Sequence, residues 1–138
     1  MKKNIITGVL LIILIILGIA LYMYNKPHKD IAAAQIDYQL SLSVLFDEFS
    51  NNPEDASIKY SEKVIAIEGK MKNLEKNENA IQLFVVDDNG RLAICEMLEF
   101  DDTNFLEGNN VKVKGLFIGY DDDLLGPEIK FKKCTILE

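Results

Sequence analysis

Val64-Ile65-Ala66-Ile67-Glu68-Gly69-Lys70-Met71, within a chain of 138 residues, has the alternation that a β-strand requires. Successive side chains of a strand point to opposite faces of a sheet, so Ile65, Ile67 and Met71 fall on one face. Gly69 interrupts the apolar pattern, and a glycine inside a strand is typical of a bulge or a sharp bend. We therefore expect this segment to form a strand that curves.

Four further segments downstream show strand character, and turn signals separate them. Lys76–Asn79 is polar enough for a hairpin loop, and Asn89-Gly90 suits the positive φ angles of a tight hairpin turn. The predicted strands are residues 80–86, 91–97, 111–120 and 128–137, and the predicted connections are residues 76–79, 87–90, 99–104, 106–110 and 121–127.

The last predicted strand changes its parity. Ile129 and Phe131 fall on one face, whereas Cys134 and Ile136 fall on the other. A bulge at Lys132-Lys133 would turn all four of these side chains inward.

Two short helices are expected before the strands. The first covers residues 43–49 with Ser43 as its cap, and the second begins after Asn52 with Pro53 at its first position and ends at Tyr60. Two short helices followed by five strands, the first of them bent, predict a mainly β domain closed into a barrel. The OB-fold is a five-stranded barrel of this kind, and a five-stranded sandwich is the competing architecture.

Residues 5–24 contain no charged side chain. Twenty helical residues at about 1.5 Å each span roughly 30 Å, the thickness of the bilayer hydrocarbon core. A cleaved signal peptide has a shorter apolar region, and the A-x-A pattern at Ala32-Ala33-Ala34 lies well beyond this run. A buried soluble helix would show a polar face. We expect residues 1–24 to be a retained transmembrane anchor, residues 25–40 a juxtamembrane linker and residues 41–138 the OB-like domain.

The orientation of this anchor is predicted from its flanks. Lys2, Lys3 and the amino terminus precede it, whereas Lys26 and Lys29 follow it with Asp30 close by. The positive-inside rule slightly favours a cytoplasmic amino terminus. The chain is thus predicted to be a single-pass bacterial membrane protein whose C-terminal domain is periplasmic or otherwise extracytoplasmic.

The domain that follows the anchor is strongly acidic. Eleven of the 15 basic residues and all 22 acidic residues fall within residues 30–138, which gives a net charge of −11. Nucleic-acid affinity comes mostly from neutralising phosphates, so nucleic acid is an unlikely partner. Anionic lipid headgroups would repel the same surface, which leaves the anchor as the expected contact with the membrane.

The sequence carries no enzymatic signature. The sole histidine, His28, lies in the predicted linker, and nucleotide-binding loops, hydrolase elbows and zinc half-sites are missing. The consecutive carboxylates of Asp121–Asp123 project in different directions, unlike the alternating ligands of a calcium loop. We therefore predict no catalytic residue, no cofactor and no metal site.

OB barrels commonly bind ligands on the face of their second and third strands and in adjoining loops. Phe84 and Arg91 lie in the corresponding segments, and Tyr120 ends the fourth predicted strand. These three residues form the predicted ligand face. For Phe84 itself the favoured interpretation is a place in the barrel core or beneath the helices.

Cys95 and Cys134 are the only cysteines, and their spacing of 39 positions matches no metal or C-x-x-C motif. The spacing leaves two readings open. The two residues are either small buried hydrophobes or, in an oxidising compartment, partners in a disulfide bond.

Several stretches resemble the tRNA_anti-like family of OB-fold proteins, which are membrane-anchored bacterial proteins of unknown function common in Bacteroidetes. These stretches are Tyr24–His28, Leu45–Phe49, Lys59–Gly69, Gly115–Tyr120 and the final strand with Cys134. The family name reflects likeness to anticodon-binding domains and does not imply tRNA binding.

The resemblance also bears on the cysteines. Family members often carry a cysteine inside the glycine pair of the fourth strand, where this chain has Leu116-Phe117-Ile118. If that cysteine is the family's partner for the terminal one, Cys95 is the only partner left for Cys134. The third and fifth strands of an OB barrel are neighbours, so the resemblance implies a Cys95–Cys134 disulfide where the geometry permits it.

Together these observations predict a membrane-anchored, non-enzymatic binding or interaction module of the bacterial cell envelope. Its ligand would be a protein, a peptide or a small molecule. The alternative function is a nucleic-acid-binding OB domain that faces the cytoplasm.

Overall fold

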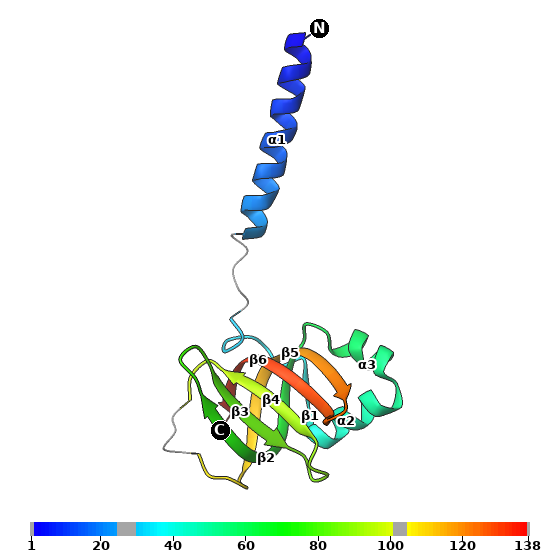
Figure 1. Ribbon diagram of the computed structural model, residues 1–138, viewed down its shortest axis with the longest axis vertical. Helices are drawn as coiled ribbons and strands as arrows, with labels where there is room; N and C mark the ends of the chain where they lie inside the picture. Colours follow the sequence, from blue (N-terminus) through cyan, green and yellow to red (C-terminus); the bar gives the residue numbers. More distant parts are fainter. Residues whose placement is uncertain (1, 25–29, 101–104, 138) are drawn as a thin grey trace.

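The computed structural model describes residues 2–24, 30–100 and 105–137 (Figure 1). Its elements in chain order are α1 (Lys2–Tyr24), β1 (Tyr38–Ser41), α2 (Leu42–Asn51), α3 (Pro53–Tyr60), β2 (Val64–Lys76), β3 (Ile81–Val86), β4 (Leu92–Met97), β5 (Asn110–Asp123) and β6 (Gly126–Leu137). The mainly β class predicted from the sequence is confirmed.

Strand β2 closes the barrel because its two halves bond to different strands. Residues 64–70 pair antiparallel with β5, and residues 70–76 pair antiparallel with β3. The sheet order is β1-β2-β3-β4-β6-β5, and the additional β2–β5 pairing joins the two sides of the sheet. The structure is therefore the predicted five-stranded barrel, and the sandwich alternative is wrong.

Strand β1 is an element that the sequence analysis missed. It lies at the end of the segment predicted as a linker, and it pairs parallel with β2 from Tyr38 opposite Ile65 to Ser41 opposite Glu68. Asp37 begins this pairing, because its carboxylate accepts a hydrogen bond from the Val64 amide at 2.8 Å. A four-residue strand of mixed polarity carries too little local pattern to be recognised without its partner.

The residues before β1 are also bound to the barrel. Ile31 is only 1% exposed, and Lys114 of β5 donates hydrogen bonds to the carbonyl oxygens of Ala32 and Ala34. The A-x-A pattern of the sequence thus lies in a segment that packs on the domain. The predicted linker also includes residues 25–29, which lie outside the described residues.

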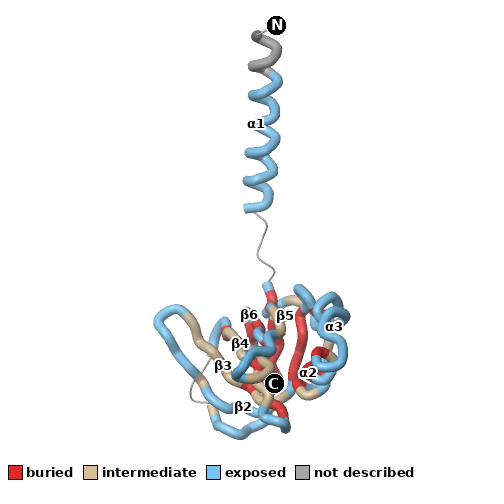
Figure 2. Tube along the Cα trace, turned by 45° about the vertical axis from the view of Figure 1, so that its right-hand side comes forward, coloured by how far each residue is buried: buried red, intermediate tan, exposed pale blue. Residues whose placement is uncertain are grey.

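The hydrophobic core fills the barrel interior and continues to the buried residues of helices α2 and α3. Figure 2 shows these buried segments. Residues 64–67 are all buried, so the first half of β2 is covered on both faces instead of one. The predicted inward positions Ile65, Ile67 and Met71 do belong to the core.

The predicted bulge does not occur at Gly69, and the predicted bend falls where β2 changes its partner, since Lys70 pairs with both β5 and β3. The pairing of β2 with β5 runs without interruption through this residue, and the register shift against β3 falls between Met71 and Asn73. A Cβ at Gly69 would lie 2.5 Å from Cγ1 of Val85 and 3.0 Å from the carbonyl oxygen of Val86. Glycine is therefore needed here because β3 approaches the β2 backbone closely.

The prediction that side chains of β6 switch from one face of the strand to the other is confirmed in the middle of the strand. Lys133 has a φ of 53°, and the β4–β6 register shifts so that Phe131 faces Cys95 while Cys134 faces Met97. Ile129, Phe131 and Cys134 are buried as expected. Ile136 was expected inside as well, but it is 39% exposed because it lies near the end of the strand.

Strands β5 and β6 are longer than predicted. Residues 121–127 were expected to form a loop, but Asp121–Asp123 pair with Gly126–Glu128 and leave only Leu124 and Leu125 in the turn. Asp121–Asp123 are exposed, so the hairpin can keep three acids in a strand without burying a charge.

Both predicted helices exist, with one correction to a cap. Asn52 caps α3 and Pro53 is its first residue, as predicted. Helix α2 begins at Leu42, and its cap is Ser41, whose hydroxyl accepts a hydrogen bond from the Val44 amide at 3.4 Å. The prediction of Ser43 as the cap was therefore wrong by two residues.

Helix α1 is continuous from Lys2 to Tyr24. Its described apolar side chains are at least half exposed, from 52% at Val9 to 89% at Tyr24. Among the described residues, no helix meets the combined length and hydropathy needed to cross a membrane.

Candidate binding face

An apolar strip lies on the outside of the β3–β4 hairpin. Leu83 and Val85 of β3 and Ala93 and Cys95 of β4 are fully buried, and the residues that alternate with them are only half-buried. Those outward residues, which we call the outer strip, are Phe84, Val86, Leu92 and Ile94.

Cross-strand pairing holds the outer strip together. Phe84 lies opposite Ile94, and Val86 lies opposite Leu92. Opposite residues on antiparallel strands have Cβ atoms roughly 4.5–5.5 Å apart, so the four side chains form one surface. Phe84 is therefore half-buried on the outside of the hairpin, and the interpretation that places it in the barrel core is wrong.

Polar residues border the outer strip. Gln82 lies opposite Glu96 at one end, and on β6 Lys130 lies beside Ile94 and Glu128 beside Leu92. The Lys130 ammonium is 2.6 Å from the Glu128 carboxylate, and this ion pair raises the pKa of the lysine. An apolar centre with a polar rim is the composition typical of a protein-binding patch.

Arg91 does not belong to this surface, because its guanidinium is fully engaged with the protein. Its Nε lies 2.7 Å from the Asp87 carboxylate and one Nη lies 2.8 Å from the Asp47 carboxylate. The other Nη donates to the Ser43 carbonyl oxygen at 3.2 Å, and the guanidinium lies 5.0 Å from the Phe46 ring centroid. Arg91 thus ties the β3–β4 turn to the start of α2.

The buried carboxylate of Asp87 is the counterpart of this arginine. Its burial would raise the pKa, but hydrogen bonds from the Arg91 amide and guanidinium, with a further one from the Asn89 amide, outweigh burial and lower it. The pair is therefore ionised at neutral pH and serves to hold the turn.

Tyr120 is also a structural residue. Its ring stacks on Phe49 with a centroid distance of 4.7 Å and meets Phe46 edge-on at 6.4 Å. Burial raises the pKa of its hydroxyl. The structure therefore brings Arg91 and Tyr120 together against α2, whereas Phe84 lies on the outer strip. Sequence reasoning missed the other three strip residues, although their alternation with buried neighbours was visible in the two predicted strands.

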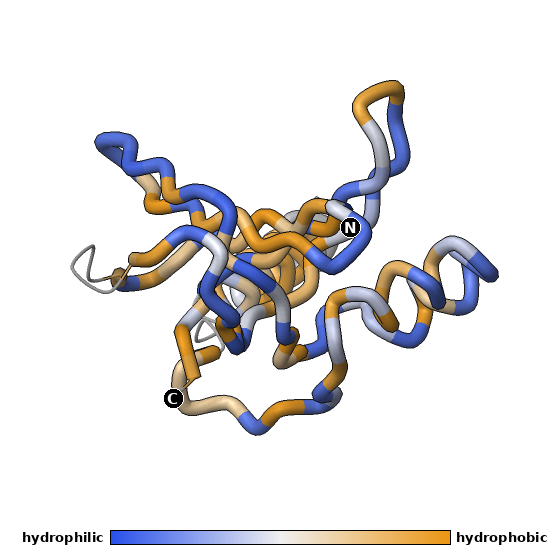
Figure 3. The backbone as a smooth tube through the Cα atoms, turned by 90° about the horizontal axis from the view of Figure 1, so that it is seen from below, coloured by the Kyte–Doolittle hydropathy of each residue, from blue (hydrophilic) through white to orange (hydrophobic). Residues whose placement is uncertain are grey.

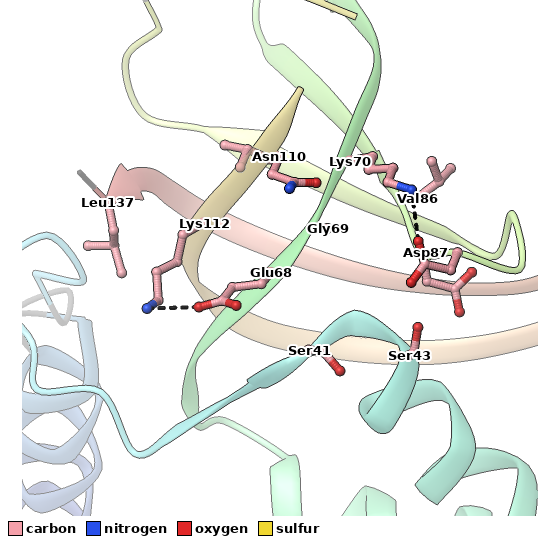
Figure 4. A pocket seen from close by; sticks show the side chains of 12 residues that line it. Ser41, Ser43, Glu68, Gly69, Lys70, Val86, Asp87, Asn110, Lys112 and Leu137 are labelled. Atoms are coloured by element: carbon pink, nitrogen blue, oxygen red, sulfur yellow. Dashed lines mark hydrogen bonds and ion pairs between the residues drawn. The ribbon is translucent and has the colours of Figure 1, made fainter. Parts of the chain in front are cut away.

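A separate cleft of about 540 Å³ lies where β2 and β5 pass the start of α2 (Figure 4). Lys112 and Glu68 form an ion pair across it at 2.9 Å, and Lys70 pairs with Asp88 at 2.8 Å. Because its lysines are neutralised by carboxylates, the cleft presents no net positive charge to an anionic ligand.

The two cysteines lie on neighbouring strands inside the barrel. Both are buried free thiols, and a hydrogen bond with Cys95 together with burial raises the pKa of Cys134. A Cβ at Gly115 would lie 2.5 Å from the Cys134 sulfur, so this glycine makes the room that the thiol occupies. The predicted disulfide stays a prediction.

No group of three or more metal-ligating side chains occurs in the part of the chain that the structure describes. Within the same residues, every buried side-chain nitrogen and oxygen has a hydrogen-bond partner. The buried polar side chains of the described residues thus bond within the protein and do not indicate a ligand site. The outer strip is therefore the candidate site.

Comparison with known proteins supports this fold. The tRNA_anti-like family model matches residues 1–126, and no protein with curated annotation matches the sequence. A crystal structure of a "putative nucleic acid-binding lipoprotein" from Klebsiella pneumoniae is similar, with a TM-score of 0.56 at 15% identity, over 82% of this chain and 100% of that one. The yeast Stn1 and Ten1 structure is more distant, with a TM-score of 0.44 at 12% identity, over 77% of this chain and 65% of that one. The aspartyl tRNA synthetase of Entamoeba histolytica has a TM-score of 0.42 at 9% identity, over 75% of this chain and 25% of that one.

Proposed function

Because the chain belongs to the tRNA_anti-like family of OB-fold proteins, we propose that it is a non-enzymatic binding module of the bacterial cell envelope. Helix α1 holds it in the membrane, and the outer strip binds a protein, a peptide or a small ligand. The observation that carries this proposal is the outer strip itself, since four adjoining apolar side chains lie on the outside of a barrel whose core is complete without them.

The charges around the outer strip favour an uncharged or basic ligand. Arg91 is occupied by two carboxylates, Lys130 is paired with Glu128, and the domain has a net charge of −11. Binding to single-stranded nucleic acid depends on a positively charged groove that follows the phosphates. No such groove adjoins the strip in the described part of the domain.

A nucleic-acid-binding domain facing the cytoplasm is the competing function. Phe84 favours it, because a base can stack on a half-buried aromatic ring at the face that OB barrels use for oligonucleotides. Phe84 is a single stacking side chain, however, and the net charge of −11 on the domain opposes the phosphate neutralisation that supplies most of the affinity.

The anchoring part of the proposal rests on α1 and on the sequence that forms it. The uncharged run covers residues 5–24, and the described side chains of the helix are exposed along its whole circumference. A helix that is apolar on all sides is unfavourable in water and needs an apolar environment. We propose that the hydrocarbon core of a bilayer provides this environment for the uncharged run of the sequence.

Anchoring is tested by extracting membranes of cells that produce the full chain with alkaline carbonate. The wild-type protein should stay in the membrane pellet, whereas a variant with Leu11→Lys and Leu14→Lys should move to the soluble fraction. Val44→Lys on α2, where the side chain is 47% exposed, is the matched control and should stay in the pellet. Release of the wild-type protein by carbonate would refute the anchor.

The ligand class and orientation are tested together. A C-terminal alkaline phosphatase fusion should be active, and the full chain in detergent should not bind a fluorescent single-stranded oligonucleotide at low salt. An inactive fusion combined with micromolar, salt-sensitive binding that Phe84→Ser abolishes would establish the competing function instead.

A further inference from the structure

The end of the β5–β6 hairpin extends beyond the barrel wall. Strand β5 pairs with β2 only up to Leu116, and β6 pairs with β4 only from Glu128 onward. Within the described residues, the last two rungs of the hairpin, Asp122 with Pro127 and Asp123 with Gly126, therefore pair only with each other. Figure 3 shows a projecting hairpin with a hydrophobic tip and one hydrophilic side, the pattern of these residues.

Two leucines form the tip of this hairpin. Leu124 is 105% exposed and Leu125 is 97% exposed, the highest values among the large hydrophobic residues of the described chain. The turn that carries them is well defined, because the Leu125 amide donates to the Asp123 carboxylate at 2.8 Å and Gly126 has a φ of 108°. The leucines are presented to solvent by a fixed turn.

The β3–β4 turn of the same barrel provides an internal comparison. It uses Asp88, Asn89 and Gly90 at its tip, and all three are polar or lack a side chain. A two-residue hairpin turn requires suitable backbone angles and has no need of leucine. The fold therefore does not explain Leu124 and Leu125, and an exposed apolar feature of this kind typically marks an interaction site.

The stem below the tip is acidic. Asp121, Asp122, Asp123 and Glu128 line it, and only Lys130 opposes them, 2.6 Å from Glu128 and 3.8 Å from Asp121. The local net charge is negative, which repels anionic lipids and phosphate backbones and attracts basic surfaces. Charge complementarity thus indicates a protein whose apolar pocket is bordered by lysine or arginine.

We propose that the Leu124–Leu125 tip is a docking knob that inserts into an apolar pocket, rimmed by basic residues, on a partner protein. The leucine tip lies apart from the outer strip, although Glu128 and Lys130 belong both to the border of the strip and to the stem of the hairpin. The inference stands without the proposed function, because it requires neither the anchor nor a ligand on β3 and β4.

The test uses a photo-cross-linking amino acid placed at Leu124 of the full chain in living cells, with the same amino acid at exposed Asn89 as the matched control. One discrete protein adduct should form from position 124 and not from position 89. Leu125→Ser should reduce the adduct at least tenfold, since burying a leucine contributes roughly 1.5–3 kcal/mol. The double substitution Asp121→Asn and Asp122→Asn should reduce it several-fold at low salt and remove its salt dependence.

The adduct is then identified by mass spectrometry, and the purified partner is titrated against the full chain in detergent with the same variants. Matching losses of affinity would support the proposal. An adduct with a second copy of the chain, binding of the tip to phosphatidylcholine vesicles, or an adduct unaffected by the Asp→Asn changes would overturn it, and so would no adduct. Leu125→Ser should leave the melting temperature unchanged, because the side chain makes no packing contact to lose.

Discussion

The ammonium group of Lys114 donates a hydrogen bond to the carbonyl oxygen of Ala32 at 2.7 Å, and a second one to that of Ala34 at 3.3 Å. The lysine is only 7% exposed, so both bonds form in a largely dry environment. The contact binds the segment before β1 to the wall of the barrel. It also holds the backbone of residues 32–34 in a turn, while the side chains of Ala32 and Ala33 stay exposed.

Replacing Lys114 by methionine should release this segment. The loss of two charge-assisted hydrogen bonds should lower the free energy of unfolding by about 1.5–3 kcal/mol. Limited proteolysis should then cut within residues 30–36 of the folded variant. Lys132→Met, at an exposed position of β6, is the control and should keep the wild-type digestion pattern. Equal resistance of both variants would mean that Ile31 alone holds the segment.

Replacing Arg91 by alanine should separate the β3–β4 turn from α2. The change leaves the buried Asp87 carboxylate without its cation, so we expect a loss of about 2–4 kcal/mol in urea unfolding. Arg91→Lys should recover only part of this, because an ammonium group cannot make the forked contacts to Asp87 and Asp47. Asp47→Asn should cost less than about 1 kcal/mol, since that side chain is 62% exposed. Full recovery by lysine would show that charge alone matters.

The Asp87 carboxyl should make the domain sensitive to acid. Burial would raise its pKa, but the hydrogen bonds from Arg91 lower it below 3.8. A carboxyl with a lower pKa in the folded state stabilises the protein above its unfolded pKa, and this contribution is lost as the pH falls through the folded pKa. Urea unfolding at a series of pH values below 5 should show this loss in the wild type. The Asp87→Asn variant should be less stable at pH 7 and should lose less on acidification, and an unchanged slope would contradict the assignment.

A methyl group at Gly69 should be costly because β3 lies against the β2 backbone there. Gly69→Ala would place its Cβ 2.5 Å from Val85 Cγ1, and overpacking of this kind costs typically about 1–3 kcal/mol. The double variant with Val85→Ala should be more stable than the sum of the two single changes predicts. Gly119→Ala meets no atom within 4 Å and is the control. Strict additivity would refute the steric explanation.

The thiols of Cys95 and Cys134 should be unreactive in the folded protein. Both residues have no exposed surface, so a reagent cannot reach either sulfur, and the raised pKa of Cys134 makes that thiol a poor nucleophile as well. Alkylation by iodoacetamide should therefore proceed only at the rate of unfolding. The predicted disulfide is checked on protein isolated without reductant and then denatured. Two alkylated thiols would refute the bond, and no alkylation until reductant is added would establish it.

Local pattern was sufficient for much of the barrel. The strand at residues 64–71, the place of the Asn89-Gly90 turn and the Asn52-Pro53 start of α3 depend on interactions within a few residues, and all three were predicted correctly. The positive φ predicted for this turn occurs at Gly90 and not at Asn89. Strand β1 was missed because its partner, β2, is distant in sequence. The loop around Leu124-Leu125 was predicted too long, because the strand pairing of Asp121–Asp123 runs against the low strand propensity of aspartate.

The candidate site was harder to predict than the fold. Phe84 and Arg91 were assigned to the ligand face because they lie in the strands that OB-folds use for binding, and the assignment of Phe84 stays a prediction. The structure shows that Asp87 and Asp47 satisfy Arg91 from within the protein. Sequence alone does not reveal whether a charged side chain already has a partner, since Asp47 is 44 positions away.

The two-part pairing of β2 also constrains the order of folding. Strands β2, β3 and β4 follow one another through short turns and can associate early, but the first half of β2 must wait for β5, far along the chain. Because these paired residues are far apart in sequence, we expect this seam to form after the hairpins. During synthesis the barrel cannot close until β5 has emerged, so the first half of β2 lacks this partner until most of the chain has been made.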